Sequence, residues 1–349
     1  MWMMRMMRIS MIVVAAALVA PGCARTPGSP TTSAAPRCGM PGAPACAQDI
    51  VAYGRECAAR IAKIPPFDCR SGTVVPITVD GRTPDRYEPG MTCDRPALLP
   101  YSEVGAEGQC VPHSRALVLQ DDAKAQVVAY CRQKRIRAAG AWLYDEVDVI
   151  AHDVETGSTC WFAAKANEPL ETDRGLDGRR VPSPDEQGPA SGAVAARDFW
   201  QPPEKTAAGR CVTCHDSDPF MWSPWAAQTG QIPKDPFGKY ANDIGAAFQR
   251  WPKPFGIATR GNACVGCHRI GSMETCHTSI LQAVGLSAEP GEDDAAKRYP
   301  HSHWMPAGNW LTERSWDVTY TESVEQLRAC CKHPLGAACV IVPITGGQR

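Results

Sequence analysis

The sequence predicts an α+β protein with two domains. Residues 37–167 are expected to form a disulfide-rich domain with helices and a β-hairpin, and residues 197–349 a loop-rich, mostly α domain. Three observations predict this division. The stretch 168–196 is polar, rich in Gly, Pro and Asp, and without periodicity, which is typical of a linker. The 17 cysteines occur on both sides of it, and seven of the ten tryptophans follow it.

The N-terminus predicts export and a lipid anchor. Two arginines precede the apolar run Ile9–Ala20, whose 12 residues are too few to span a bilayer and typical of a signal-peptide core. The segment Leu18–Cys23 resembles the lipobox of bacterial lipoproteins, so we expect residues 1–22 to be removed and Cys23 to be lipidated. The alternative is cleavage at a small-residue site, which would leave a soluble periplasmic protein. Residues 23–36 are predicted to be a flexible tether.

The first domain is predicted to begin with a helix over 47–63. Apolar residues recur at helical spacing from Ile50 to Ile61, and two successive prolines then end the helix. Residues 70–112 are rich in Gly and Pro with short apolar runs, so we expect loops and short strands held by disulfides.

A second helix is predicted from Asp121 or Asp122 to about Arg137. Acidic residues stand at its start and basic residues at its end, which is the order that the helix macrodipole favours. This order accounts for the basic run 132–137; the alternative is that the run docks a partner. Alternating residues on both sides of a Gly-containing turn then predict a β-hairpin over 142–165.

The second domain contains the sequence C-x-x-C-H twice, at residues 211–215 and 264–268. This spacing is the attachment signature of c-type haem, because two cysteines can form thioethers to the porphyrin and the histidine can bind the iron. The motifs resemble those of c-type cytochromes, specifically a two-haem member, and the resemblance is confined to them and the surrounding C-terminal domain. It implies two covalent haem c groups, with residues in these roles: covalent attachment by Cys211, Cys214, Cys264 and Cys267; proximal iron ligation by His215 and His268.

The alternative for these cysteines is a structural Cys₄ zinc site, which leaves the histidine after each second cysteine unexplained. Only 48 residues separate His215 from Cys264. A single-haem domain of the family needs more chain than this, so we expect one cytochrome c-type domain that shares two haems, with a short helix at each motif. The tryptophans and phenylalanines concentrated after residue 196 suit the apolar walls that haem requires.

Methionine and histidine are the usual sixth ligands of cytochrome irons. The candidates cluster in Pro300–Pro306, where alternate residues would face one side of an extended segment. A methionine followed by proline also resembles the distal-ligand loop of small cytochromes c. The candidate distal ligands are therefore Met305, His303, His301 and, nine residues after the second motif histidine, His277.

Cysteine counting supports the same interpretation. Four cysteines for haem and one for lipid leave twelve, an even number that suits disulfides in an exported protein. Eight lie before the linker and four after it. Because a bridge between neighbours is strained, Cys330 and Cys331 are predicted to pair with Cys276 and Cys339. The pairing of the other eight stays open.

These observations favour an electron carrier on the periplasmic face of the cell envelope, anchored through Cys23, where Ala24 as the next residue favours the outer membrane. Its redox partner protein is not specified by the sequence. The formal net charge of −1 argues against a nucleic-acid partner. The alternatives are a haem enzyme, a peroxidase or small-molecule oxidase with one open iron, and a haem-based sensor or binding module. The two-haem bacterial cytochrome c peroxidases are similar in haem count but have wider spacing, so no catalytic residue is carried over.

Overall fold

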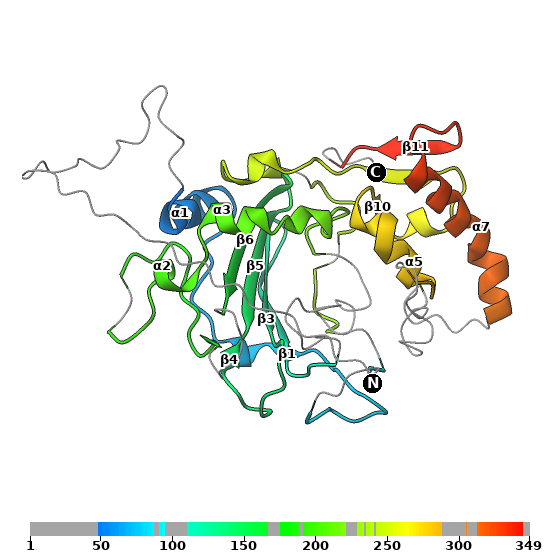
Figure 1. The fold of residues 1–349 in the computed structure, drawn as a ribbon. Coiled ribbons are helices and arrows are strands. Elements are labelled where there is room, and N and C mark those ends of the chain that lie inside the picture. Colours follow the sequence, from blue (N-terminus) through cyan, green and yellow to red (C-terminus); the bar gives the residue numbers. More distant parts are fainter. Residues whose placement is uncertain are drawn as a thin grey trace, which may run out of the picture. The chain divides into compact units, whose positions relative to one another are not determined.

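A six-stranded β-sheet lies at the centre of the computed structural model (Figure 1). The model describes residues 48–86, 91, 93–94, 110–166, 175–188, 191–220, 229–233, 235–240, 242–287, 305 and 313–344. All of them belong to one compact unit, Ala47–Arg349. Among these residues, no helix combines the length and the apolar character needed to cross a bilayer.

The sheet has the strand order β1-β2-β3-β5-β6-β8, and its neighbours are antiparallel except for the parallel pair β6 and β8. Its strands are β1 (Thr73–Val74), β2 (Arg115–Asp121), β3 (Ala125–Arg132), β5 (Glu146–Asp153), β6 (Ser158–Lys165) and β8 (Asn242–Asp243). The short strands β4 (Leu143–Tyr144) and β7 (Leu176–Asp177) form a separate antiparallel pair. The three long central strands are almost continuously buried, so both faces of the sheet must be covered.

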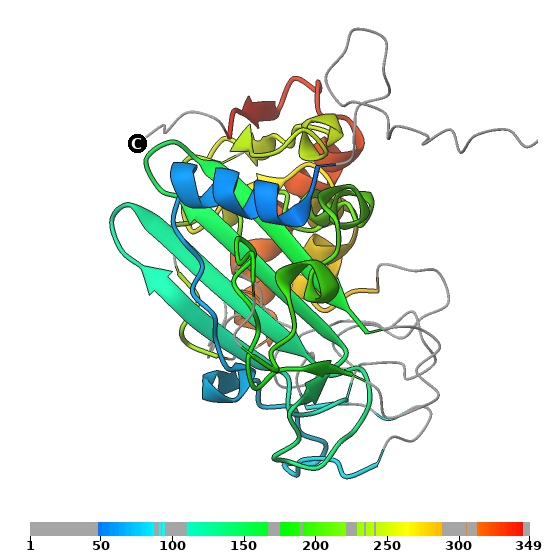
Figure 2. The same ribbon diagram turned by 90° about the vertical axis from the view of Figure 1, so that its left-hand side faces the viewer.

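One face of the sheet is covered by helix α1 (Ile50–Arg60), which lies across the strands in Figure 2. Alternate strand residues share a face, so Cys131, Cys160 and Phe162 point to the same side. The ring of Tyr53 on α1 packs 5.0 Å from that of Phe162. The disulfides Cys57–Cys160 and Cys69–Cys131 link this side of the sheet covalently to the N-terminal segments.

The opposite face of the sheet carries Trp161, which packs against segments from the C-terminal half. Its ring lies 5.6 Å from that of Trp251, and its Nε1 donates to Asp243 Oδ1 at 2.9 Å. Trp251 in turn donates from Nε1 to Ala207 O at 2.7 Å. The neighbouring elements include α3 (Pro203–Ala208), η2 (Cys211–Thr213) and η3 (Phe248–Arg250), whereas α2 (Ala196–Phe199) contacts α1.

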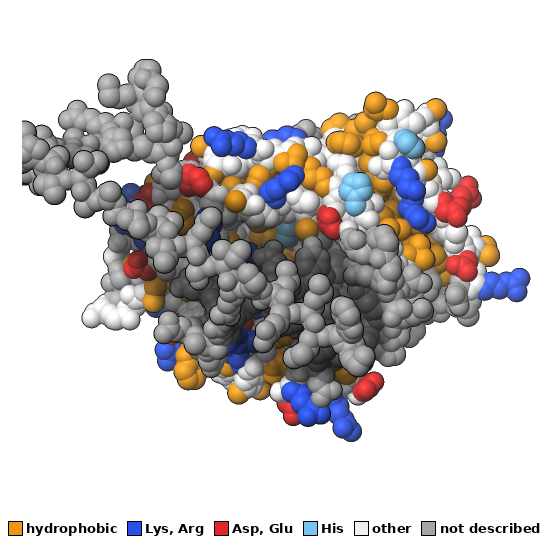
Figure 3. All heavy atoms as spheres, viewed as in Figure 1, with side chains coloured by type: hydrophobic (Ala, Val, Ile, Leu, Met, Phe, Trp, Pro, Cys, Tyr) orange, Lys and Arg blue, Asp and Glu red, His pale blue; other side chains and the backbone are white. Residues whose placement is uncertain are grey.

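The C-terminal elements are built around a three-stranded sheet with the order β10-β9-β11 and helix α7, which packs on β9. They are β9 (Gly256–Thr259), η4 (Cys264–Gly266), β10 (Ile270–Gly271), η5 (Thr275–Ser279), α5 (Ile280–Ala283), α7 (Glu313–Lys332) and β11 (Cys339–Val342). Figure 3 shows exposed hydrophobic side chains gathered over this part of the molecule, and the exposed ones include Val318, Leu335, Val340 and Ile341.

The α+β composition and the disulfide-rich character are confirmed, as are the helix predicted over 47–63 and the hairpin over 142–165, which is β5 and β6. The predicted pairing is also confirmed, with bridges Cys276–Cys331 and Cys330–Cys339. The helix predicted over 121–137 is wrong, because the middle of this segment is strand β3 and none of its residues is helical. Asp122, expected to cap that helix, instead holds the turn between two strands by accepting from the N–H groups of Lys124 and Ala125 at 2.8 and 2.9 Å.

The division into two domains is not confirmed. One hydrophobic core includes residues from both predicted domains, from Ile50 to Ile344. The described part of the predicted linker also packs on the first domain: Val181 pairs with Phe67 in a β-bridge, and Gly178 O accepts from Cys69 N at 2.8 Å. The segment 175–188 is therefore part of the packed structure.

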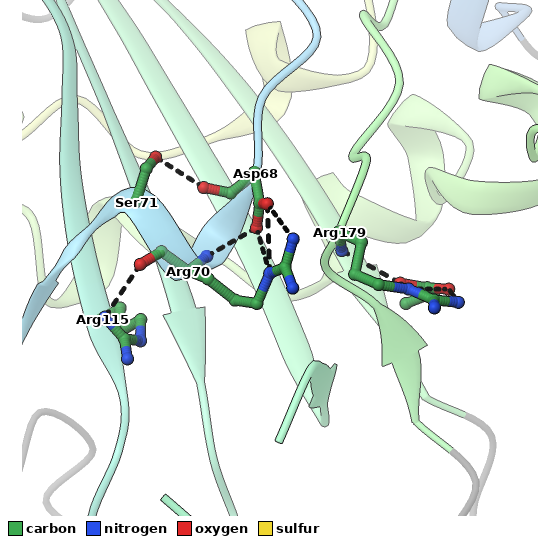
Figure 4. A network of polar contacts seen from close by, with 6 residues as sticks. Asp68, Arg70, Ser71, Arg115 and Arg179 are labelled. Atoms are coloured by element: carbon green, nitrogen blue, oxygen red, sulfur yellow. Dashed lines mark hydrogen bonds and ion pairs between the residues drawn. The ribbon is translucent and has the colours of Figure 1, made fainter. Parts of the chain in front are cut away.

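Charged residues form ion pairs and hydrogen bonds at the surface where these segments meet (Figure 4). Arg70 and Arg179 each bind the aspartate two residues earlier in the chain, with shortest N–O distances of 2.5 and 2.6 Å. Arg115 donates from Nη1 to the carbonyl oxygen of Arg70 at 3.0 Å. These ion pairs are exposed to solvent, which screens them, so they contribute little to stability.

Candidate functional site

The four motif cysteines differ from every other cysteine that the structure describes. The other ten described cysteines form five disulfides, whereas Cys211, Cys214, Cys264 and Cys267 are free thiols. Each motif begins a short 3₁₀ turn, η2 or η4, which confirms the expected short helix. Cys23, predicted to be lipidated, lies outside the described residues, as do Cys38 and Cys46.

Both motif histidines are held in the tautomer that an iron ligand needs. Nδ1 of His215 lies 2.8 Å from Pro219 O, and Nδ1 of His268 lies 2.9 Å from Arg269 O. A carbonyl oxygen can only accept, so each Nδ1 carries a hydrogen, and in the neutral ring Nε2 is then the nitrogen with the free lone pair. Burial lowers the pKa of His215 to about 4, which keeps this ring neutral at physiological pH.

The first motif lies against the sheet face that is opposite to α1. The Trp161 ring meets the His215 ring edge-on, with centroids 5.3 Å apart. Tyr240 is buried and donates from its hydroxyl to His215 O at 2.7 Å. Val212, inside the motif, belongs to the main core. The first domain therefore supplies one wall of the first motif's surroundings.

A cluster of charged side chains shares this face of the sheet. Arg132 on β3 lies 3.0 Å from Asp148 on β5, and Lys134 lies 2.9 Å from Glu146. Burial and the Glu146 carboxylate raise the pKa of Asp148. Burial also opposes ionisation of Glu146, but Arg132 and Lys134 outweigh it and lower the pKa of Glu146 to about 2. The basic run 132–137 thus balances acids of the neighbouring strand.

The second motif is tied to helix α7. Asn262 Oδ1 accepts from Cys264 N at 3.0 Å, and Asn262 Nδ2 donates to Ser323 O at 2.8 Å. Ser323 Oγ accepts from Ala263 N at 3.0 Å. Cys264 also packs on a small cluster that includes Trp316 and Val324 of the same helix. The disulfides of α7 therefore hold the segment on which this motif rests.

A hydrogen-bond network joins the residues that follow the two motifs. Asp216, which follows His215 and is 0 % exposed, accepts from Met273 N at 2.6 Å and Thr275 N at 3.3 Å, and also from Thr275 Oγ1. A Cβ at Gly271 would lie 2.2 Å from Asp216 Oδ1, so glycine is needed for this approach. Burial raises the pKa of Asp216 to about 6 against the effect of these donors.

The next residue, Ser217, extends the network. Its carbonyl oxygen accepts from Arg269 Nε at 3.0 Å, and its Oγ accepts from Gly271 N at 3.1 Å. Arg269 follows His268, so a few covalent bonds and one hydrogen bond connect the two histidines. This path limits the separation of their Cα atoms to at most about 22 Å.

The candidate distal ligands are placed only in part. His301 and His303 lie outside the described residues. His277 is exposed on η5. Met305 N donates to Ala283 O at 2.8 Å, and Met305 O accepts from Trp316 Nε1 at 2.6 Å. Since Trp316 belongs to the cluster that contacts Cys264, Met305 lies on the side of the second motif.

The residues present fit covalent haem, because each motif combines two free cysteines with a histidine whose Nδ1 faces a carbonyl oxygen. Two buried polar atoms beside the motifs, Thr213 Oγ1 and Arg269 Nη2, have no hydrogen-bond partner among the described residues.

Sequence reasoning missed several residues of this site. Asp216 and Arg269 each follow a motif histidine, and this adjacency was the available signal. Trp161 lies about 50 residues before the first motif, and only strand pairing brings it to the site, so no local pattern indicates it.

Comparisons with family models, with curated proteins and with solved structures gave no match. The site is therefore defined by its own geometry: two C-x-x-C-H turns with free cysteines and oriented histidines, joined by the network around Asp216 and Ser217.

Proposed function

We propose that this protein is a dihaem c-type cytochrome that relays single electrons on the periplasmic face of the cell envelope. Bound haem c supplies an iron that gains and loses one electron. Cys211 and Cys214 hold one group and Cys264 and Cys267 the other, while His215 and His268 supply Nε2 as proximal ligands. The carbonyl partners of their Nδ1 atoms fix both rings and raise their basicity.

The observation that carries the proposal is the network between the motifs. Electron relay needs two redox groups at a fixed and short separation. Asp216 and Ser217 bind residues 270–275 through buried hydrogen bonds. The two segments that carry His215 and His268 are therefore fixed relative to each other. A two-domain enzyme with a separate domain around each haem would not need this contact.

Further roles follow from the same proposal. Met305 is the candidate distal ligand of the iron bound by His268, because its backbone is fixed beside the cluster that contacts Cys264. The distal ligand of the other iron is sought among His301, His303 and His277. Lipidation of Cys23 would anchor the protein, and the tether 23–36 would let it reach a redox partner protein.

The proposal is tested by the visible spectrum of the reduced protein, produced with a cytochrome c maturation system. We expect two covalent haems per chain, and one in each of the matched double variants C211A/C214A and C264A/C267A. Carbon monoxide should leave the spectrum unchanged, because protein ligands close both irons. Binding of carbon monoxide at one haem would instead favour the enzyme or the sensor, and a protein without haem bands would overturn the proposal.

A further inference from the structure

Arg269 holds a positive charge in the interior beside both motifs. Its side chain is only 8 % exposed, and Nε donates to Ser217 O at 3.0 Å. Nη2 has no hydrogen-bond partner among the described residues. The Asp218 and Asp235 carboxylates act on the guanidinium electrostatically, but neither accepts a hydrogen bond from Nη2. An unused donor on a buried charged group is costly, so this site calls for a further acceptor.

The direction of the side chain shows where that acceptor belongs. Arg269 starts next to His268, but its guanidinium ends at Ser217, two residues after His215. It also acts electrostatically with Tyr240, whose hydroxyl binds His215 O. The charge therefore lies on the side of the first motif, although it belongs to the chain segment of the second.

We propose that Arg269 binds a propionate carboxylate of the haem attached at Cys211 and Cys214, an inference that rests on the proposed function. Haem carries two carboxylates that must enter the protein with it. A guanidinium forms parallel N–H···O bonds to a carboxylate, which would use the free Nη2 donor. The segment of the second motif thus supplies the anion-binding group of the first haem.

This assignment predicts an effect on redox potential. The positive charge of Arg269 neutralises a carboxylate near the first iron and so disfavours the more positive ferric state. Removing the charge should therefore make this haem harder to reduce. The redox potential of the second haem should change less, even though Arg269 directly follows the histidine of that haem in the sequence.

The experiment is a spectroscopic redox titration of the holoprotein carrying R269Q. We expect the equilibrium constant for reduction of one haem to fall at least tenfold, which is 59 mV for a one-electron couple. The matched control is R210Q, which removes the exposed arginine immediately before Cys211 and should leave both potentials unchanged. In the C211A/C214A background, which keeps only the second haem, R269Q should have no comparable effect.

The outcomes separate this inference from the proposed function. A holoprotein with two haems whose potentials do not respond to R269Q would overturn the role of Arg269 alone. A shift that persists in the C211A/C214A background would assign the arginine to the second haem and also overturn the inference. If R269Q does not accumulate, R269K retains the charge without the planar fork. In R269K the equilibrium constant for reduction of the first haem should stay within threefold of the parent value. The propionate bending band in resonance Raman spectra should change, and an unchanged band would count against the inference.

Discussion

At the scale of single residues, His152 shows how burial sets a protonation state close to the first motif. Its ring meets those of Phe220 and Tyr240 edge-on, with centroids 6.2 and 6.3 Å away, and Nδ1 lies 3.0 Å from Thr159 Oγ1. Burial lowers the pKa of His152 to about 4. The folded protein therefore keeps this ring neutral, while the unfolded chain takes up a proton near the ordinary value of about 6.5.

This difference predicts a loss of stability in acid. Between about pH 6.5 and pH 4 the unfolded state binds the extra proton, so the free energy of unfolding falls as the pH falls. His152 alone should remove about 2 kcal/mol between pH 7 and pH 4.5. The variant H152N should be less stable than the parent at pH 7, and this gap should narrow by that amount at pH 4.5. Urea unfolding at both pH values measures it; a gap independent of pH would show that His152 has the same pKa in the folded and unfolded states.

The residue scale also shows what the sequence can and cannot predict about the site. The spacing of the motifs separates their four cysteines from the others, so the pairing of Cys330 and Cys331 with Cys276 and Cys339 could be predicted and is confirmed. Trp161 and Arg269 could not be assigned, because their roles depend on contacts between distant segments.

At the scale of elements, the segment after Asp121 shows why a charge pattern can mislead. Acids followed by bases suit a helix, but Ala125–Arg132 is a run of buried apolar residues that pairs with strands on both sides. The bases after it are balanced across the sheet rather than along a helix axis. Arg137 binds both carboxylate oxygens of Asp145 at 2.7 and 2.6 Å. Local order of charges does not reveal such cross-strand pairs.

The buried position of this ion pair predicts a large effect on stability. The side chains of Arg137 and Asp145 are 5 % and 0 % exposed, so R137A leaves a buried carboxylate without its main partner. We expect the free energy of unfolding to fall by about 3 to 5 kcal/mol. The matched control is R70A, which breaks the exposed pair with Asp68. The side chains of this pair are 46 % and 32 % exposed, so R70A should lower the free energy of unfolding far less than R137A. Equal effects in denaturant unfolding would show that the interior pair is solvated.

At the scale of the whole molecule, the sequence predicts two domains because its composition changes near residue 168. The structure instead builds a common core in which Tyr53 of α1 stacks on Phe248 at 5.2 Å and Trp161 contacts His215 and Trp251. A change of composition can mark a change of chemistry without marking a boundary in packing. Whether such a change is also a domain boundary depends on which distant segments pack together, and a single sequence does not reveal that packing.

The shared core predicts that the C-terminal half cannot enclose its first haem alone. A chain of residues 197–349 would lack Tyr53 and Trp161, and would expose Phe248 and Trp251 to water at a cost of about 1.5 to 3 kcal/mol for each large side chain. In the full chain, far-UV circular dichroism of the sheet and haem absorbance should report one coincident thermal transition. The isolated fragment should show no cooperative transition, and its first haem, although still attached through Cys211 and Cys214, should lie open to solvent and bind carbon monoxide. Two separate transitions in the full chain, or a fragment that unfolds cooperatively and binds no carbon monoxide, would instead establish two independent domains.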